Sequence, residues 1–164
     1  MFNKLKRIIL NLGFLNRIFG KKIIHLEGIY FTSKKLKKHL RKYKSKCYCV
    51  CPVNYEYFNS FLVTNLTKNE FYKSLKKNYL ELKEMRISLQ LHVHLALLPN
   101  RLSYAKKESM IKSAYDFFVK ELDIVPTEIV FGWYSSDKES IEIANSFGLK
   151  VIKEHLHIYD WWLE

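Results

Sequence analysis

The stretch Leu89-Gln90-Leu91-His92-Val93-His94-Leu95 sets two histidines, one residue apart, in an apolar run that predicts a buried β-strand. Side chains alternate between the two faces of a strand, so His92 and His94 share one face and the apolar residues occupy the other. Two imidazoles on one face at the end of a buried strand indicate a metal site. The alternative interpretation is structural, with both rings hydrogen-bonded inside the core.

Strand and helix signals alternate on both sides of this stretch. Strands are predicted over residues 23–31, 47–53, 87–97, 128–133 and 150–153, with a closing segment over 155–162. Helices are predicted over residues 34–44, 67–85, 103–122 and 136–148, whereas residues 54–66 are aromatic and irregular. This alternation is typical of βα units and predicts an α/β fold with a largely parallel sheet of about five to six strands, open or partly curled into a barrel.

Two of the helices have sequence signals at their ends. Thr67-Lys68-Asn69-Glu70 is a capping box, and the buried stripe of the helix behind it is predicted to hold Phe71, Leu75, Tyr79 and Leu82. Ser136-Asp137-Lys138-Glu139 is a second capping box. Gly148 is expected just past the end of that second helix.

Polar residues gather where the predicted strands end. In parallel α/β sheets, ligands bind at the carboxyl ends of the strands. The residues predicted at that edge are Glu27, Asn54, His92, His94, Tyr134 and the segment 155–160. Because these strand ends share one edge of the sheet, we expect the side chains to lie together and to form a functional site.

The composition is that of a basic globular protein. The chain of 164 residues fits one domain, and its 15% aromatic content excludes an intrinsically disordered composition. Its formal net charge of +12 favours anionic partners such as nucleic acid, acidic lipid or an anionic glycan. The lysines are spread over helix faces without an arginine-rich stripe, so nucleic-acid binding rests on net charge alone and is the least favoured of these.

Cys47, Cys49 and Cys51 alternate along one predicted strand and therefore share a face. Neighbouring thiols on a regular strand are poorly placed for a disulfide, and their number is odd. We therefore expect reduced cysteines and a cytoplasmic setting. A thiolate metal site is the alternative, but it lacks a second cysteine cluster that would complete four ligands.

Residues 1–20 place apolar side chains at helical spacing with lysines and arginines between them. This pattern predicts a basic amphipathic helix ahead of a single domain over residues 21–164. The helix can lie on an anionic membrane surface, making the protein membrane-peripheral, or dock on the rest of the fold. The charged residues interrupt the apolar run, so neither a signal peptide nor a transmembrane span of roughly 18 apolar residues is expected.

The order of motifs resembles the polysaccharide deacetylase family of metal-dependent carbohydrate esterases, over roughly residues 22–164. Ile24-His25-Leu26-Glu27-Gly28 stands where the family has a Thr-Phe-Asp-Asp-Gly-like motif, and Leu91-His92-Val93-His94 resembles the strand that enters its histidine pair. Looser matches are Phe131-Gly132-Trp133-Tyr134 with an Arg-Pro-Pro-Tyr-like loop, residues 143–152 with a helix end, and Asp160-Trp161 with an Asp-Trp motif.

This resemblance implies a partial, distorted (β/α) barrel that holds a divalent metal, with zinc expected. The implied ligands are Glu27, His92 and His94. The implied activity is a metal-dependent hydrolase that removes an acyl group from a sugar or polysaccharide, in which the metal polarises the acyl carbonyl and activates water.

The resemblance also suggests residues for the rest of the chemistry. His157 and Asp160 are the candidates for acid/base catalysis, since an aspartate can orient an imidazole and raise its basicity. Tyr134 is the candidate for lining the acyl pocket, with its backbone N–H available to an oxyanion. The alternative for residues 155–162 is a last strand and aromatic plug that seals the barrel.

The sequence departs from the family pattern in three places. Leu26 stands at the position of the catalytic base, and a hydrophobic side chain cannot take a proton. The family's histidines are usually four residues apart, whereas here Ala96 occupies that place and the second histidine comes two residues after the first. The final strand with a general-acid histidine is expected beyond residue 164, which is why His155 or His157 would have to substitute.

These departures support further hypotheses. One is a catalytically inactive deacetylase-like fold that binds a glycan or a partner protein. Another is a peripheral membrane protein held by residues 1–20. A barrel with an open edge would also favour a homo-oligomer in which a second copy covers that edge.

Overall fold

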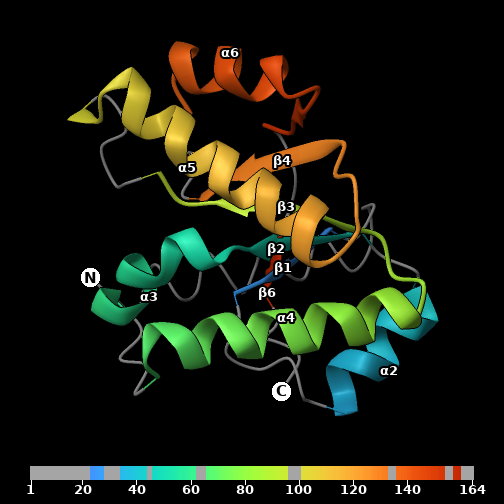
Figure 1. Cartoon of the computed structure of the whole chain (residues 1–164). Helices are drawn as coiled ribbons and strands as arrows, with labels where there is room; N and C mark the ends of the chain where they lie inside the picture. Colours follow the sequence, from blue (N-terminus) through green and yellow to red (C-terminus); the bar gives the residue numbers. More distant parts are fainter. Residues whose placement is uncertain are drawn as a thin grey trace, which may run out of the picture.

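The computed structural model describes residues 23–27, 34–43, 46–61, 66–95, 101–132, 136–153 and 157–159. Strands run through the centre between the helices (Figure 1). The strands of the described residues are β1 (Ile23–Leu26), β2 (Cys47–Val50), β3 (Leu89–Val93), β4 (Glu128–Phe131), β5 (Lys150–Val151) and β6 (His157–Tyr159). Each predicted strand has a counterpart among the described residues. The amphipathic helix predicted over residues 1–20 lies outside the described residues, as do Tyr134 and Asp160.

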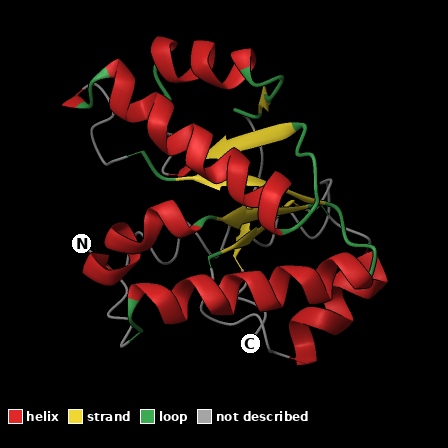
Figure 2. Ribbon diagram, in the orientation of Figure 1, coloured by secondary structure: helices red, strands yellow, loops and turns green. Residues whose placement is uncertain are grey.

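Helices flank the strands on both sides in the view of Figure 2. They are α2 (Lys34–Tyr43), α3 (Tyr55–Phe61), α4 (Lys68–Glu84), α5 (Tyr104–Asp116) and α6 (Lys138–Ser146), with a 3-10 turn over Pro52–Asn54 and a π-helical turn over Phe117–Glu121. The prediction that residues 54–66 are irregular was wrong for α3. Pro52 opens the 3-10 turn that leads directly into this helix, and Phe58, three residues after Tyr55, is its buried anchor.

All strand pairs of the sheet are parallel, and the spatial order is β5-β4-β3-β2-β1-β6. Consecutive strands lie side by side from β1 to β5, and the last strand returns to pair with the first. This is the order of a (β/α) barrel that is open between β5 and β6, where the described residues form no ladder. The predicted α/β fold with a parallel sheet of five to six strands is confirmed.

The register divides the sheet into two faces, because residues paired across parallel strands point the same way. The polar face consists of His25, Glu27, Tyr48, Gln90, His92, His94 and Glu128, with Val50 and Val130 between them. The apolar face consists of Ile24, Leu26, Cys47, Cys49, Leu91, Val93, Ile129 and Phe131, which form one buried core with side chains of the helices. The helices therefore pack on the apolar face of the sheet, and the histidines and carboxylates share the polar face.

The predicted capping box of α4 is confirmed. The Thr67 hydroxyl accepts from the backbone N–H of Glu70, whose carboxylate accepts from the backbone N–H of Thr67. The predicted buried stripe of α4 is confirmed as well, since Phe71, Leu75, Tyr79 and Leu82 are all buried. A stripe of this kind holds the helix against the apolar face of the sheet.

The predicted cap of α6 is displaced by one residue. Asp137, rather than Ser136, is the N-cap and forms a capping box with Ser140. The Glu139 carboxylate instead pairs with the buried Lys107 of α5, which also binds Asp137. Gly148 has a φ of 72°, which confirms it as the residue past the helix end.

No disulfide joins the three cysteines, which agrees with the prediction of reduced thiols, and each side chain is buried with 0% exposure. Burial also raises the pKa of the Cys51 thiol, so the reactive thiolate is disfavoured there. We expect Ellman's reagent to label none of the thiols of the native protein and three per chain after unfolding. Rapid labelling of the native protein would contradict this burial.

None of the described helices has the length and apolar character of a membrane-spanning segment.

Candidate metal centre at the carboxyl edge of the sheet

Four ionisable side chains meet on the polar face across β2. His25 lies in β1 and Glu27 directly follows it, whereas His92 lies in β3 and His94 directly follows that strand. All four are buried. Val50 of β2 pairs in register with His92 and lies between the two strands, and its short side chain leaves room for longer ones to meet over it.

Glu27 is the centre of this group. Its Oε1 lies 3.0 Å from His92 Nε2 in hydrogen-bond geometry, and its Oε2 lies 3.3 Å from His94 Nε2. The contact with His94 is within ion-pair distance and does not have hydrogen-bond geometry. Thus each carboxylate oxygen faces one imidazole.

The hydrogen bond of the other ring nitrogen of His92 shows which nitrogen carries a hydrogen. Nδ1 lies 3.2 Å from the backbone carbonyl oxygen of Val130, which can only accept, so Nδ1 carries a hydrogen and donates it. If Nε2 carries no hydrogen, its lone pair faces the Glu27 carboxylate. Two hydrogen-bond acceptors would then be in contact, which is unfavourable. A proton shared between the two groups, or a metal ion bound by both, would relieve this contact.

His94 is held by its neighbours rather than by hydrogen bonds of its ring. It stacks on Tyr57 with ring centroids 4.1 Å apart and meets Phe58 edge-to-face. Asn54 Nδ2 donates to the His94 backbone carbonyl at 2.7 Å, which brings the predicted Asn54 to the site. A Cβ on Gly132 would lie 2.1 Å from His94 Nδ1, so only glycine fits beside the ring.

Several buried polar atoms of this region lack a hydrogen bond among the described residues, and those of His94 and Asn54 matter here. These atoms are Nδ1 and Nε2 of His94 and Oδ1 of Asn54. Buried polar atoms in native proteins are nearly always satisfied by protein, water or an ion. Imidazole and carboxylate are also donors that zinc prefers. The donor set therefore fits a divalent metal, and the buried His/Glu/His group of His25, Glu27 and His92 is compatible with a metal site.

The histidines govern the charge of Glu27. Burial alone would raise the pKa of this carboxyl, but His92 and His94 overcome that effect and lower the pKa from 4.5 to about 2. The pKa of His94 is itself lowered, first by burial and then by the nearby His92. The group therefore combines an ionised carboxylate with a His94 ring that favours its neutral form.

These pKa shifts predict acid sensitivity of the metal-free protein. The folded state holds Glu27 ionised down to a pKa of about 2, while the unfolded chain takes up the proton near 4.5. The resulting stabilisation, about 3 kcal/mol, is present above pH 4.5 and is lost as the pH falls toward 2. The lowered pKa of His94 acts in the same direction below pH 6.5.

Urea unfolding in a chelator, from about pH 7 down to about pH 2, measures this loss. Glu27→Gln serves as the reference, because it removes the titrating carboxyl and nearly keeps its shape. The stability difference between the two proteins should be largest above pH 4.5 and should shrink toward pH 2. A difference that stays constant with pH would show that the Glu27 pKa is ordinary.

The predicted site residues have different outcomes. Glu27, His92 and His94 are brought together, and whether they bind a metal stays a prediction. His157 lies in β6, where its backbone pairs with Ile23, four residues before Glu27. His25 was missed, although the rule applied to His92 and His94 predicts that His25 and Glu27, two residues apart, share a face.

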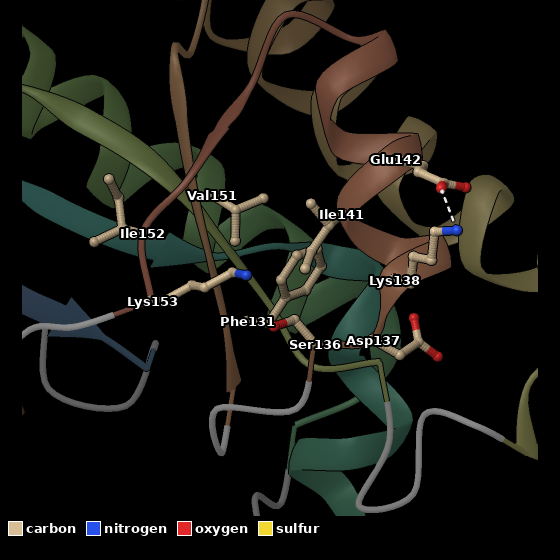
Figure 3. Close-up of a pocket in the computed structure, with 9 residues that line it drawn as sticks. All are labelled: Phe131, Ser136, Asp137, Lys138, Ile141, Glu142, Val151, Ile152 and Lys153. Carbon is tan, nitrogen blue, oxygen red and sulfur yellow. Dashed lines mark ion pairs between the residues drawn. The ribbon is translucent and has the colours of Figure 1, made fainter.

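A cavity of about 670 Å³ also opens at the carboxyl edge, between the ends of β4 and β5 and the start of α6 (Figure 3). It is lined by Phe131, Ser136, Asp137, Lys138, Ile141, Glu142, Val151, Ile152 and Lys153. None of the four clustered residues lines it, because Phe131 and Val151 belong to the helix-covered side of the sheet. Gly132, which follows the lining residue Phe131 in the chain, lies beside the His94 ring.

Comparisons with known proteins support the fold. No protein-family model matches the chain, and no curated protein matches it. Among solved structures, it is similar to the crystal structure of a mutant of a CE4-family pseudoenzyme with restored enzymatic activity, at a TM-score of 0.55 and 12% sequence identity. The match covers 81% of this chain and 44% of that chain, so this chain spans less than half of its length. At this identity the similarity shows a deacetylase-like fold alone.

Proposed function

We propose that the protein is a divergent metal-dependent hydrolase that removes an acyl group from a sugar or polysaccharide. The observation that carries the proposal is the buried group of Glu27, His92 and His94 at the carboxyl edge of a deacetylase-like parallel sheet. Zinc is the expected ion, because the donors are imidazole nitrogens and a carboxylate. When bound, the ion would polarise an acyl carbonyl and lower the pKa of a water molecule.

The residues of the chain would prepare this chemistry. Glu27 and His92 would hold the ion, and the hydrogen bond from His92 Nδ1 to the Val130 carbonyl leaves Nε2 as the nitrogen available to a metal. Tyr57 and Phe58 cover His94 and keep water from that side of the group. These contacts support a site whose donors are oriented before an ion arrives.

For proton transfer, His157 and Asp160 remain the candidates. The parallel register sets Tyr159 beside His25, and Asp160 is the next residue in the chain, whereas His157 is two residues before Tyr159. Tyr134, two residues after Gly132, remains the candidate for the acyl pocket. These three roles are proposals that rest on position in the sequence and on the register of β6.

The metal content of the purified protein tests the proposal first. Plasma mass spectrometry should find about one equivalent of zinc or another divalent ion, and a His92→Ala/His94→Ala double variant should lose it. Release of acetate from acylated sugars by the loaded protein would establish hydrolysis. A folded protein that takes up no metal when supplied with it would reject the proposal.

Leu26 favours a second candidate function, a catalytically inactive fold that binds a glycan or a partner protein. Its side chain is fully buried within the apolar core, so the position that resembles a catalytic base holds no proton acceptor. A protein that binds one equivalent of metal, binds glycans and releases no acyl group would support this candidate. Turnover of any acylated sugar that depends on His92 would exclude it.

A further inference from the structure

We propose that His25, rather than His94, supplies the third protein ligand of the metal centre, and that His94 acts as a positioning residue for Glu27. This inference rests on the proposed function only in that the centre binds a divalent ion. It changes the ligand set from Glu27, His92 and His94 to His25, Glu27 and His92, and it gives His94 a different role.

The distances between ligand atoms support this set. One ligand atom each from His25, Glu27 and His92 lies within 4.8 Å of the other two, and all three side chains are buried. An ion at their centre would need only small movements of the side chains to reach the usual zinc distances of roughly 2.0–2.2 Å. His94 does not belong to this set, although its Nε2 approaches one oxygen of Glu27.

The fold explains why His25 reaches the centre. It precedes Glu27 by two residues in β1 and therefore points to the same face. Its ring meets the His92 ring edge-to-face at 4.5 Å between centroids. The two rings thus approach each other over β2, next to the carboxylate that would share the ion with them.

The surroundings of His94 suit a positioning role. Its Nε2 faces Glu27 Oε2, whereas Oε1 is the oxygen that faces His92. Stacking on Tyr57 and the close approach of Gly132 hold the ring in place from other directions. Oε1 can then serve the ion while His94 orients the carboxylate through Oε2, as groups around a metal site commonly orient its ligands.

The resulting set of two imidazoles and one carboxylate has chemical consequences. Catalytic zinc sites commonly have three protein ligands and keep a fourth position for water or substrate, and two histidines with one glutamate form one of the known sets. With His94 outside the coordination shell, that fourth position remains open.

The test is zinc titration of the full chain, with each histidine changed to phenylalanine to keep ring volume. We expect His25→Phe to weaken zinc affinity by more than about 100-fold and His94→Phe by about 10–100-fold, the range found for groups that orient ligands. His39→Phe on α2, which lies outside the group of His25, Glu27 and His92, is the control and should bind zinc like the unchanged protein.

Nitrogen NMR of ¹⁵N-histidine protein distinguishes a ligand from a positioning residue. On adding zinc, one ring nitrogen each of His25 and His92 should shift strongly, as direct coordination requires. The His94 ring should shift little, and the shifts of His25 and His92 should persist in His94→Phe at saturating zinc.

The outcomes separate this inference from the proposed function. If the unchanged protein binds no zinc, the proposed function fails. If it binds zinc and His25→Phe binds equally well while the His94 ring shifts, the inference is overturned and the set of Glu27, His92 and His94 stands. Should circular dichroism show that His25→Phe does not fold, His25→Gln, which is polar and of similar reach, replaces it in the same titration.

Discussion

Replacing Glu27 with glutamine (E27Q) is expected to weaken zinc binding by more than about 100-fold, since even groups that merely orient metal ligands contribute about 10–100-fold. Glutamine keeps the shape of the side chain and removes its negative charge. That charge would balance the charge of the ion. The carboxylate also links the end of β1 to β3, because Oε1 faces His92 and Oε2 faces His94. The neutral amide would offer the ion only a weak carbonyl oxygen.

Thermal unfolding with added zinc measures this effect. At zinc concentrations about 100 times the dissociation constant of the unchanged protein, that protein should gain about 2.7 kcal/mol of stability, and the variant should gain less than about 0.4 kcal/mol. Glu128→Gln is the matched control, because Glu128 is a carboxylate on the same polar face that binds Lys46 and Tyr48 instead. Equal zinc stabilisation of E27Q and the unchanged protein would remove Glu27 from the ligand set.

Replacing Leu26 with aspartate (L26D) is expected to destabilise the protein strongly, not to install a catalytic base. Leu26 is fully buried on the apolar face, opposite to His25 and Glu27. Emptying a buried leucine site costs about 2–5 kcal/mol, and an unpaired carboxylate in the same place adds to that cost.

Denaturant unfolding and an acetate-release assay on L26D test this expectation together. Leu26→Met, which conserves volume, is the control and should cost less than about 1.5 kcal/mol. An L26D protein with unchanged stability and new hydrolytic activity would show that residue 26 faces the site. If L26D is destabilised and inactive, any proton acceptor must come from the polar face or from the segments that follow the strands.

The alternation of strands and helices was predictable from the sequence because each element has a local signal. The capping box at Thr67 and the apolar spacing of α4 are contained within a few turns of chain, and both are confirmed. The α6 cap is Asp137 rather than Ser136, and Lys107 of a different helix binds both Asp137 and Glu139. A distant partner of this kind has no signal in the local sequence.

The candidate site also has features with a local sequence signal and features that depend on distant residues. The spacing of His92 and His94 predicted a shared face, since the period of a strand is a local property. The contact between Glu27 and His92 depends instead on the order and register of the sheet. In that order β2 separates β1 from β3, and the short side chain of Val50 lets Glu27 reach His92. His25 could have been found from its spacing to Glu27, whereas its contact with the His92 ring could not.

The return of β6 to the side of β1 affects how the chain acquires its fold. The pairing of Ile23 with His157 joins nearly the two extremes of the described sequence, so it closes one of the longest loops the chain can form. Contacts between distant residues slow folding, because loop entropy is lost before they become favourable. On the ribosome, one edge of β1 would stay without its neighbour until β6 has been synthesised. During this interval the nascent chain presents an unpaired strand edge, the kind of surface to which chaperones and other incomplete chains bind.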